Sequence, residues 1–206
     1  MGNWDCLRHP GSASLSPMSL PDSLLDAGRR LASQCGTLSF SAPVWSVYHS
    51  LEYAWDGYAA YLNRFAGSPK RALFLGMNPG PWGMAQTGVP FGEIPAVRDW
   101  MGLHASIRKP AREHPKRPVE GFACTRSEVS GRRLWGLFAA SWGSADAFFA
   151  DNLVLNYCPL AFLMESGANL TPDKLTAGER QPLLTACDAH LAEAIRLLDP
   201  EWLIGV

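Results

Sequence analysis

Apolar residues along the chain gather in short continuous runs that are separated by stretches of helical period. The runs Leu73–Leu75 and Leu153–Leu155 are typical of strands that helices cover on both faces of a parallel sheet. Residues 201–206 form a third apolar run, which predicts another buried strand, and residues 44–48 are also strand-like. Strands that alternate with helices predict an α/β fold, a three-layer α/β/α sandwich around a central parallel sheet of about four strands.

Five stretches have the apolar period or the boundary signals of helices. The predicted helices cover residues 22–36, 58–65, 96–101, 130–142 and 177–198. We expect Asp22 or Ser23 to cap the first helix and Ser130 to cap the fourth, in which Leu137 should face the core. Thr176 and Glu179 have the spacing of a capping box at the start of the last helix.

Length and composition indicate one domain, since 47% of the 206 residues are hydrophobic and 18% are charged. Residues 1–21 are rich in Ser, Gly and Pro, which predicts a flexible leader before a domain at 22–206. No apolar run reaches about 18 residues and no signal peptide opens the chain, so we expect an intracellular protein without a membrane partner. The five cysteines are scattered without a C-x-x-C pair, which predicts reduced thiols, no metal site and no cofactor.

The first candidate site is the loop of residues 76–92, which is dense in Gly and Pro and follows the first apolar run. Ligands of open α/β sheets bind beyond the carboxyl ends of the strands, where Met77 and Asn78 lie. Gly80 lets the backbone approach a ligand closely, and Phe91 offers a flat surface for stacking. The spacing of a Walker phosphate loop is present, but the Lys-Ser/Thr that should follow is not. A structural loop that holds a buried asparagine is the alternative.

A second asparagine, Asn156, closes the second apolar run and is followed closely by Pro159. Because the carboxyl ends of parallel strands lie at one edge of a sheet, two strand-terminal asparagines can line one pocket. A buried asparagine that only holds a loop is again the alternative.

Several motifs share one resemblance. The loop contains GMNPGP and GMAQTGVPFG, and later segments contain VRDW, EHPKRP, SEVSG, NYCPL and NLTP, which begin at residues 97, 113, 127, 156 and 169. These motifs resemble those of the single-strand-selective monofunctional uracil-DNA glycosylases, and the similarity covers nearly everything after about residue 40. The resemblance implies a uracil-DNA glycosylase-like fold.

The same resemblance implies a function in DNA base-excision repair. Members flip uracil and 5-substituted uracils, such as 5-hydroxymethyluracil, out of single- and double-stranded DNA and remove them by hydrolysis, leaving an abasic site. By resemblance, Asn78 is the catalytic residue, which positions the attacking water. Substrate would be bound by Met77, Gly80, Met84, Phe91 and Asn156, and DNA by Ser166, Gly167, Asn169, Thr171 and Lys174. A monomer in the nucleus, with uracil-containing DNA as its partner, is expected.

The implied role of Asn156 agrees with the chemistry of its side chain. A carboxamide both donates and accepts, so one asparagine can pair with the N3–H and O4 edge of uracil. Cytosine presents the reverse pattern on that edge. The asparagine therefore has the means to discriminate between the two bases.

Charge is nearly balanced over the whole chain, with a formal net charge of −1, but it is not evenly distributed. Residues 104–133 carry eight Lys and Arg against three Glu. Such a segment is either a positive surface for DNA or a solvated loop. His114 lies within it and is expected to be solvated.

The end of the sequence limits the activity that we expect. Related family members continue past a strand such as 201–206 into a helix, a loop of the His-Pro-Ser-Pro type and a final helix. That loop supplies a histidine for the departing uracil anion and a wedge for the base stack, so we expect this C-terminally incomplete form to be a poor glycosylase. Two other interpretations stay open: a non-catalytic module that binds uracil-containing or abasic DNA, and an unrelated α/β small-molecule hydrolase.

Overall fold

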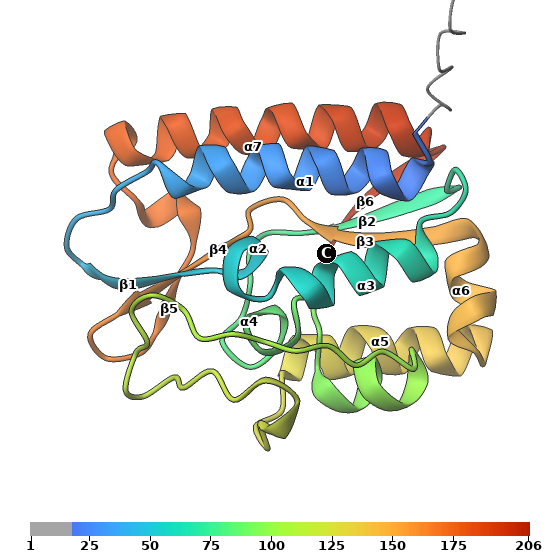
Figure 1. The fold of residues 1–206 in the computed structure, drawn as a ribbon, viewed down its shortest axis with the longest axis horizontal. Helices are drawn as coiled ribbons and strands as arrows, with labels where there is room; N and C mark the ends of the chain where they lie inside the picture. Colours follow the sequence, from blue (N-terminus) through green and yellow to red (C-terminus); the bar gives the residue numbers. More distant parts are fainter. Residues whose placement is uncertain (1–17) are drawn as a thin grey trace, which may run out of the picture.

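A parallel sheet lies between two layers of helices in the computed structural model, which describes residues 18–206 (Figure 1). The sheet has three strands in the order β3–β2–β6. Their bounds are Ala72–Gly76 for β2, Asn152–Asn156 for β3 and Trp202–Gly205 for β6. β2 pairs in parallel with both neighbours, so the carboxyl ends of the strands lie at one edge of the sheet.

A second, antiparallel sheet takes up the strand that was expected at residues 44–48. Its order is β1–β4–β5, where β1 is Val44–His49, β4 is Leu160–Met164 and β5 is Asn169–Leu170. The parallel sheet therefore has three strands where the sequence suggests about four. The sequence does not separate β4 from β3, because residues 157–159 alone lie between the two apolar strands.

Helices α1 and α7 cover one face of the parallel sheet, and α3 and α5 lie on the other side (Figure 1). The longer helices are α1 (Leu20–Gly36), α3 (Trp55–Phe65), α5 (Val129–Trp142), α6 (Ala145–Asp151) and α7 (Ala177–Leu198). The shorter ones are α2 (Ser50–Tyr53), α4 (Met84–Thr87), a π-helical turn at Ala96–Trp100 and 3-10 turns at Gly121–Ala123 and Pro172–Lys174. Among the helices of residues 18–206, none is long and apolar enough to cross a membrane.

The predicted capping box of α7 is confirmed, but α1, α3 and α5 begin before the expected residues, α3 at Trp55 and not at Tyr58. α1 begins at Leu20, where the Ser19 hydroxyl accepts a hydrogen bond from Asp22 N, so the ordered domain begins before residue 22. The rest of the predicted leader, residues 1–17, lies outside the described residues. α5 begins one residue before Ser130, whose hydroxyl donates to the Glu128 carboxylate instead of capping the helix. Leu137 faces outward and is 61% exposed, because Trp135 and Phe138 are the α5 residues that fill the core.

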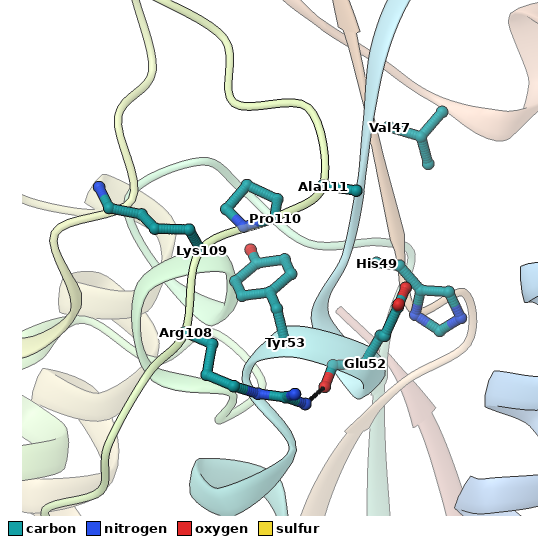
Figure 2. Close-up of a pocket in the computed structure, with 8 residues that line it drawn as sticks. All are labelled: Val47, His49, Glu52, Tyr53, Arg108, Lys109, Pro110 and Ala111. Atoms are coloured by element: carbon teal, nitrogen blue, oxygen red, sulfur yellow. Dashed lines mark hydrogen bonds between the residues drawn. The ribbon is translucent and has the colours of Figure 1, made fainter.

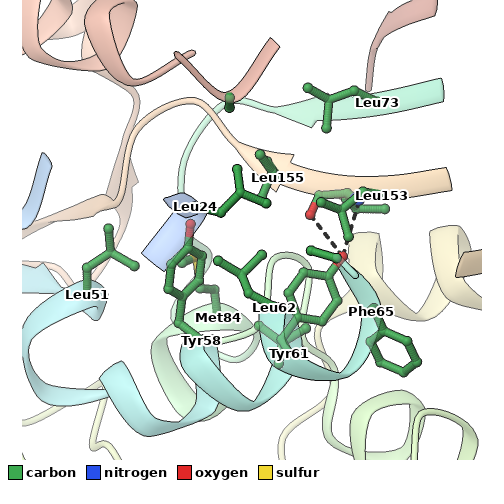
Figure 3. Close-up of a cluster of buried hydrophobic side chains, with 14 of the residues drawn as sticks. Leu24, Leu51, Tyr58, Tyr61, Leu62, Phe65, Leu73, Met84, Leu153 and Leu155 are labelled. Atoms are coloured by element: carbon green, nitrogen blue, oxygen red, sulfur yellow. Dashed lines mark hydrogen bonds between the residues drawn. The ribbon is translucent and has the colours of Figure 1, made fainter. Parts of the chain in front are cut away.

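Tyr61 joins α3 to the sheet from inside the core (Figure 3). The side chain is fully buried, and its hydroxyl donates to the Val154 carbonyl (2.9 Å) and accepts from Val154 N (3.1 Å). Burial raises the pKa of the Tyr61 hydroxyl above its usual range, so the group stays a neutral donor. These two bonds place α3 against the middle of β3 and so fix the strand that ends at Asn156.

The strand predicted at the end of the chain is present as β6, but its side chains are not buried. Trp202, Leu203 and Ile204 are 61%, 49% and 38% exposed. β6 pairs with β2 at the edge of the sheet, and the described residues leave its side chains open to solvent. The apolar run therefore predicted the strand correctly, and its exposure agrees with the expectation that a helix which would cover it follows this strand in related family members.

Stability should depend on pH through His190 of α7, which is 8% exposed and packs beside α1. Removal from water lowers its pKa to about 4; Glu193 opposes this shift and Arg30 adds to it. Because the unfolded chain has the higher histidine pKa, it binds the extra proton first, and stability is lost as pH falls from about 6.5 to 4.

We expect urea unfolding to give roughly 2 kcal/mol less stability at pH 4.5 than at pH 7 from this group alone. His190→Leu should remove that difference, whereas the same change at His104, which is exposed, should keep it. Equal pH dependence in the parent and His190→Leu would show that the histidine is not the titrating group.

Candidate active site

A cavity of about 160 Å³ opens at the carboxyl ends of β2 and β3. Its lining residues are Asn78, Gly80, Met84, Phe91, Glu128, Ser130, Asn156 and Asn169. Both strand-terminal asparagines are present, as the sequence predicts, together with the proposed stacking ring. The in-register pairing of β2 with β3 places Gly76 opposite Asn156 and so brings the two loops to one point.

Asn78 is oriented by one hydrogen bond to the second sheet. Its Nδ2 donates to the carbonyl of Leu160, the first residue of β4, at 3.1 Å. Because the amide nitrogen is used in this bond, Oδ1 remains as the acceptor for a ligand or a water molecule. Pro79 follows and restricts the backbone of Asn78 to extended conformations, which further limits the directions of the side chain.

Asn156 has only a weak partner within the cavity. Its Nδ2 lies 3.2 Å from the Met84 sulfur, and a thioether is a poor acceptor. A ligand carbonyl can therefore replace this contact with a gain in hydrogen-bond strength. The arrangement leaves the Asn156 carboxamide ready to recognise a polar edge.

Gly76 is the point on which Phe91 and Asn156 both pack. A Cβ atom at Gly76 would lie 2.4 Å from the Phe91 ring and 2.5 Å from Asn156 Oδ1. No real side chain tolerates such contacts, so glycine is required for the ring and the amide to occupy their places. The absence of a side chain at residue 76 thus lets two residues that line the cavity, Phe91 and Asn156, take their positions.

Phe91 itself has a left-handed backbone, with φ at +52°, which is uncommon for a bulky residue. Its carbonyl accepts from Trp135 Nε1 at 3.0 Å, and a Cβ on Gly131 would lie 2.1 Å from the same oxygen. Two features of α5, an indole donor and a missing side chain, therefore hold the Phe91 backbone in a strained conformation. Strain of this kind persists where the surroundings over-determine it, as they do here.

Glu128 also lines the cavity, although no apolar run or strand end in the sequence indicates it. Its carboxylate accepts from the Ser130 hydroxyl at 2.6 Å, and its Oε2 lies against Gly80, where a Cβ would be 2.5 Å away. A Cβ at Gly83 would lie 2.9 Å from Glu128 Cγ. Among the described residues that line the cavity, Glu128 is the charged one. Its membership in the SEVSG motif was the only signal for it in the sequence.

Gln86 connects the pocket loop to the segment that precedes α5, and it was also missed. The side chain is fully buried, and its Nε2 donates to the carbonyls of Pro81 (2.8 Å) and Pro118 (2.9 Å). Its Oε1 accepts from Glu120 N (2.8 Å) and Gly121 N (3.1 Å). All four hydrogen-bonding positions of the amide are occupied, so the two segments are joined rigidly.

The remaining predicted substrate residue, Met77, lies beside the cavity and does not line it. The Met77 side chain is 53% exposed, and its carbonyl accepts from Cys158 N at 2.9 Å. The backbone oxygen therefore joins the ends of β2 and β3. The structure thus gives Met77 a place outside the lining of the cavity and a role in holding the loop after Asn156.

The predicted DNA-binding residues lie in and after the β4–β5 turn. Asn169 lines the cavity and its Nδ2 donates to the Pro79 carbonyl at 3.1 Å, whereas Ser166 and Gly167 form the turn itself. Lys174 lies farther along and pairs with Asp173 at 2.9 Å, and Thr171 donates to the same aspartate. Asn169 is thus brought to the site, and the charge of Lys174 is largely balanced by its neighbour.

A second hollow, of about 120 Å³, lies between β1, α2 and the segment at 108–111 (Figure 2). Arg108 closes one side by donating to the Glu52 carbonyl at 2.6 Å. This hollow contains neither strand-terminal asparagine, and its tyrosine, Tyr53, is buried. No group of three or more metal-binding side chains occurs among residues 18–206. The chemistry predicted for the two amides therefore belongs to the first cavity.

Comparison with known proteins gives the family. The chain is 48% identical over 201 residues to the single-strand selective monofunctional uracil-DNA glycosylase of Rattus norvegicus. The aligned residues make up 97% of this chain and 72% of the relative. The enzymes of that name from Mus musculus and Bos taurus are 47% and 49% identical, over 97% and 93% of this chain and 73% and 70% of the relatives. The chain belongs to this family.

A solved structure supports the fold of this uracil-DNA glycosylase family member. The crystal structure of wild-type SMUG2 from Pedobacter heparinus has a TM-score of 0.53, covers 92% of this chain and 87% of that chain, and is 14% identical. At that identity the likeness shows the fold alone. No family model matches the chain.

The position of Gly76 generates a direct test of this site. Gly76→Ala should displace the Phe91 ring and the Asn156 amide together, and binding of uracil-containing DNA should fall at least tenfold, since stacking alone is worth about 1–3 kcal/mol. Gly136→Ala in α5 is the matched control, because nothing lies within 4 Å of a Cβ there and alanine favours the helix.

Both variants should be checked for cooperative unfolding before binding is compared. Normal binding by a folded Gly76→Ala protein would contradict the requirement for glycine.

Proposed function

We propose that the chain acts as a uracil-DNA glycosylase in base excision repair and hydrolyses the bond between a flipped base and its deoxyribose. The observation that carries the proposal is the cavity in which Asn78, Phe91 and Asn156 come together at the ends of two parallel strands. Relatives at 47–49% identity are named as uracil-DNA glycosylases. We further propose that the protein acts as a monomer and, because the proposed substrate is DNA, that it acts in the nucleus.

Base recognition rests on an amide and a ring. The Asn156 Nδ2, which has only the Met84 sulfur as partner, would donate to uracil O4, and Oδ1 would accept from N3–H. Phe91 would stack on the pyrimidine face. With cytosine, the Asn156 Nδ2 donor would face the amino group at C4, and the Oδ1 acceptor would face the acceptor N3. Unpaired buried polar groups of this kind can give discrimination on the order of 10⁴-fold.

Asn78 would position the water for the chemical step. The Oδ1 that the Leu160 contact leaves free would accept from the water, whose oxygen then bonds to C1′ as the bond from C1′ to N1 breaks. The bonding electron pair departs with uracil, which takes up a proton. Since no lysine lines the cavity in the described chain, we propose water as the only nucleophile and an abasic site as the product.

The wall of the cavity that Glu128 forms beside Gly80 supports activity on 5-substituted uracils in single- and double-stranded DNA. Glu128 Oε2 occupies the space that a Cβ at Gly80 would fill, and it has no hydrogen-bond donor from the described residues. A carboxylate accepts from a hydroxyl and repels another carboxylate. The wall therefore fits a 5-hydroxymethyl group and disfavours a 5-carboxyl group.

Single-turnover cleavage of a uracil oligonucleotide, read as alkali-labile breaks, tests the catalytic assignment. Asn78→Ala should lower the rate about 10²-fold with little change in DNA affinity, because water positioning matters in the transition state. Phe91→Ala should instead weaken binding by about 1–3 kcal/mol. DNA binding by the parent without any cleavage would favour a non-catalytic binding module, and the opposite pattern in the two variants would reverse their roles.

Glu128→Gln tests the recognition of the 5-substituent. Loss of the charge should slow excision of 5-hydroxymethyluracil about fivefold, since a hydrogen bond to a charged group is worth roughly 1 kcal/mol more than a neutral one. Excision of 5-carboxyuracil should rise, and excision of plain uracil should change little. A uniform change across the three substrates would place Glu128 outside the recognition of the base.

A further inference from the structure

Two arginines flank one tryptophan of the pocket loop. Trp82 lies between Gly80 and Gly83, and it is half-buried. The guanidinium carbon of Arg117 is 5.3 Å from the centre of the Trp82 ring, and that of Arg126 is 5.7 Å from it. Both distances are within the range of cation–π attraction, so the indole holds two positive groups close to the loop that forms the cavity.

The charges of these two arginines are not balanced within the described chain. Residues 18–206 place no carboxylate within 4.0 Å of Arg117 or Arg126, whereas Lys109 is paired with Glu113 at 2.7 Å. The Arg117 side chain donates from Nη1 to the Lys116 carbonyl at 2.8 Å, and its buried Nε has no hydrogen-bond partner among the described residues. Two like charges held together without an acid are unfavourable unless an anion joins them.

A buried histidine fixes the position of Arg117. His114 was expected to be solvated, but it is 1% exposed and its ring packs edge-on against Trp45. Its backbone N donates to the Tyr48 hydroxyl at 2.8 Å, and that hydroxyl donates to the Arg117 carbonyl. The His114 carbonyl accepts from Arg117 N at 2.9 Å. The turn at 114–117 is therefore attached to β1 and is not a solvated loop.

The fixed turn places Arg117 next to the hairpin that completes the cavity. A Cβ at Gly167 would lie 3.3 Å from the Arg117 guanidinium carbon. Two residues later, Asn169 lines the cavity and bonds to the Pro79 carbonyl. Arg117 thus lies between the pocket loop and the β4–β5 hairpin, at the rim of the site.

Three other cations of the basic segment are held elsewhere. Arg108 donates to the Glu52 carbonyl, Lys109 pairs with Glu113, and Arg112 lies 3.9 Å over the Trp45 ring. Of the basic residues between 104 and 126, Arg117 and Arg126 are the ones that the structure holds on the pocket loop. Two cations of the segment are therefore held at the rim of the site, and three are held away from it.

We propose that Arg117 and Arg126, held on Trp82, bind backbone phosphates of the DNA strand whose base enters the cavity. This inference rests on the proposed function, because it takes that strand as the ligand. A guanidinium binds phosphate through two parallel N–H groups, and grooves that bind single strands combine cations with aromatic rings. The contacts carry no sequence information and hold the strand in register with the pocket.

Salt dependence of DNA binding tests the proposal. The dissociation constant of a single-stranded oligonucleotide with one uracil is measured by fluorescence anisotropy, with a 2′-fluoroarabino sugar that resists cleavage, from about 50 to 200 mM KCl. Arg117→Ala and Arg126→Ala should each reduce the slope of log K against log salt by about 0.7 and weaken binding roughly fivefold at 0.1 M salt. With an oligonucleotide that contains no uracil, the two variants should show the same decrease in slope and in affinity.

Arg29→Ala is the matched control, since Arg29 is also held on an indole, 4.2 Å over Trp55, and lines a different hollow. Arg29→Ala should leave the slope of the parent unchanged. Arg117→Lys and Arg126→Lys, which keep the positive charge, should keep most of that slope. An unaltered slope in both alanine variants, or no DNA binding by the parent, would overturn the inference. If the parent cleaves uracil DNA but the slopes are unaltered, the phosphate contacts are wrong and the proposed function stands. If the slopes change but the parent does not cleave, the phosphate contacts stand and the proposed catalytic function is wrong.

Discussion

The parallel, in-register pairing of β2 with β3 is the constraint on which the site depends. It places Gly76 opposite Asn156, and the two loops that leave these strands then have to share one small volume. The Phe91 ring and the Asn156 amide fit together only because residue 76 has no side chain. A shift of the pairing by one residue would turn Asn156 to the other face of the sheet and dismantle the cavity.

Missing side chains do as much to shape the cavity as the side chains that line it. Gly131 makes room for the Phe91 carbonyl, and Gly80 and Gly83 make room for Glu128. In each case a buried or half-buried group occupies the space that a Cβ would fill. The Gly-rich character of the loop is thus explained by close packing between segments far apart in sequence, and not by flexibility.

The sequence predicts those features that are local. The strands at 73–75 and 153–155 and the capping box of α7 follow from short-range patterns, and Asn78 and Asn156 were found because each ends an apolar run. Features that depend on distant contacts were missed or wrong. β1 could not be assigned to its own sheet without its partner β4, and the burial of His114 depends on Tyr48. Glu128 and Gln86 reach the site through tertiary contacts that have no periodic signal.

The fully bonded amide of Gln86 has a kinetic consequence. To open the pocket loop away from residues 118–121, the protein would have to leave several buried polar groups unpaired, at about 1–3 kcal/mol each. The cavity is therefore preformed, and in the proposed function the nucleotide has to supply the conformational change. Capture should then follow the fraction of time that a base already spends outside its stack. Breathing, mismatched or unpaired positions would be sampled first, and a stable base pair would be passed over during the search.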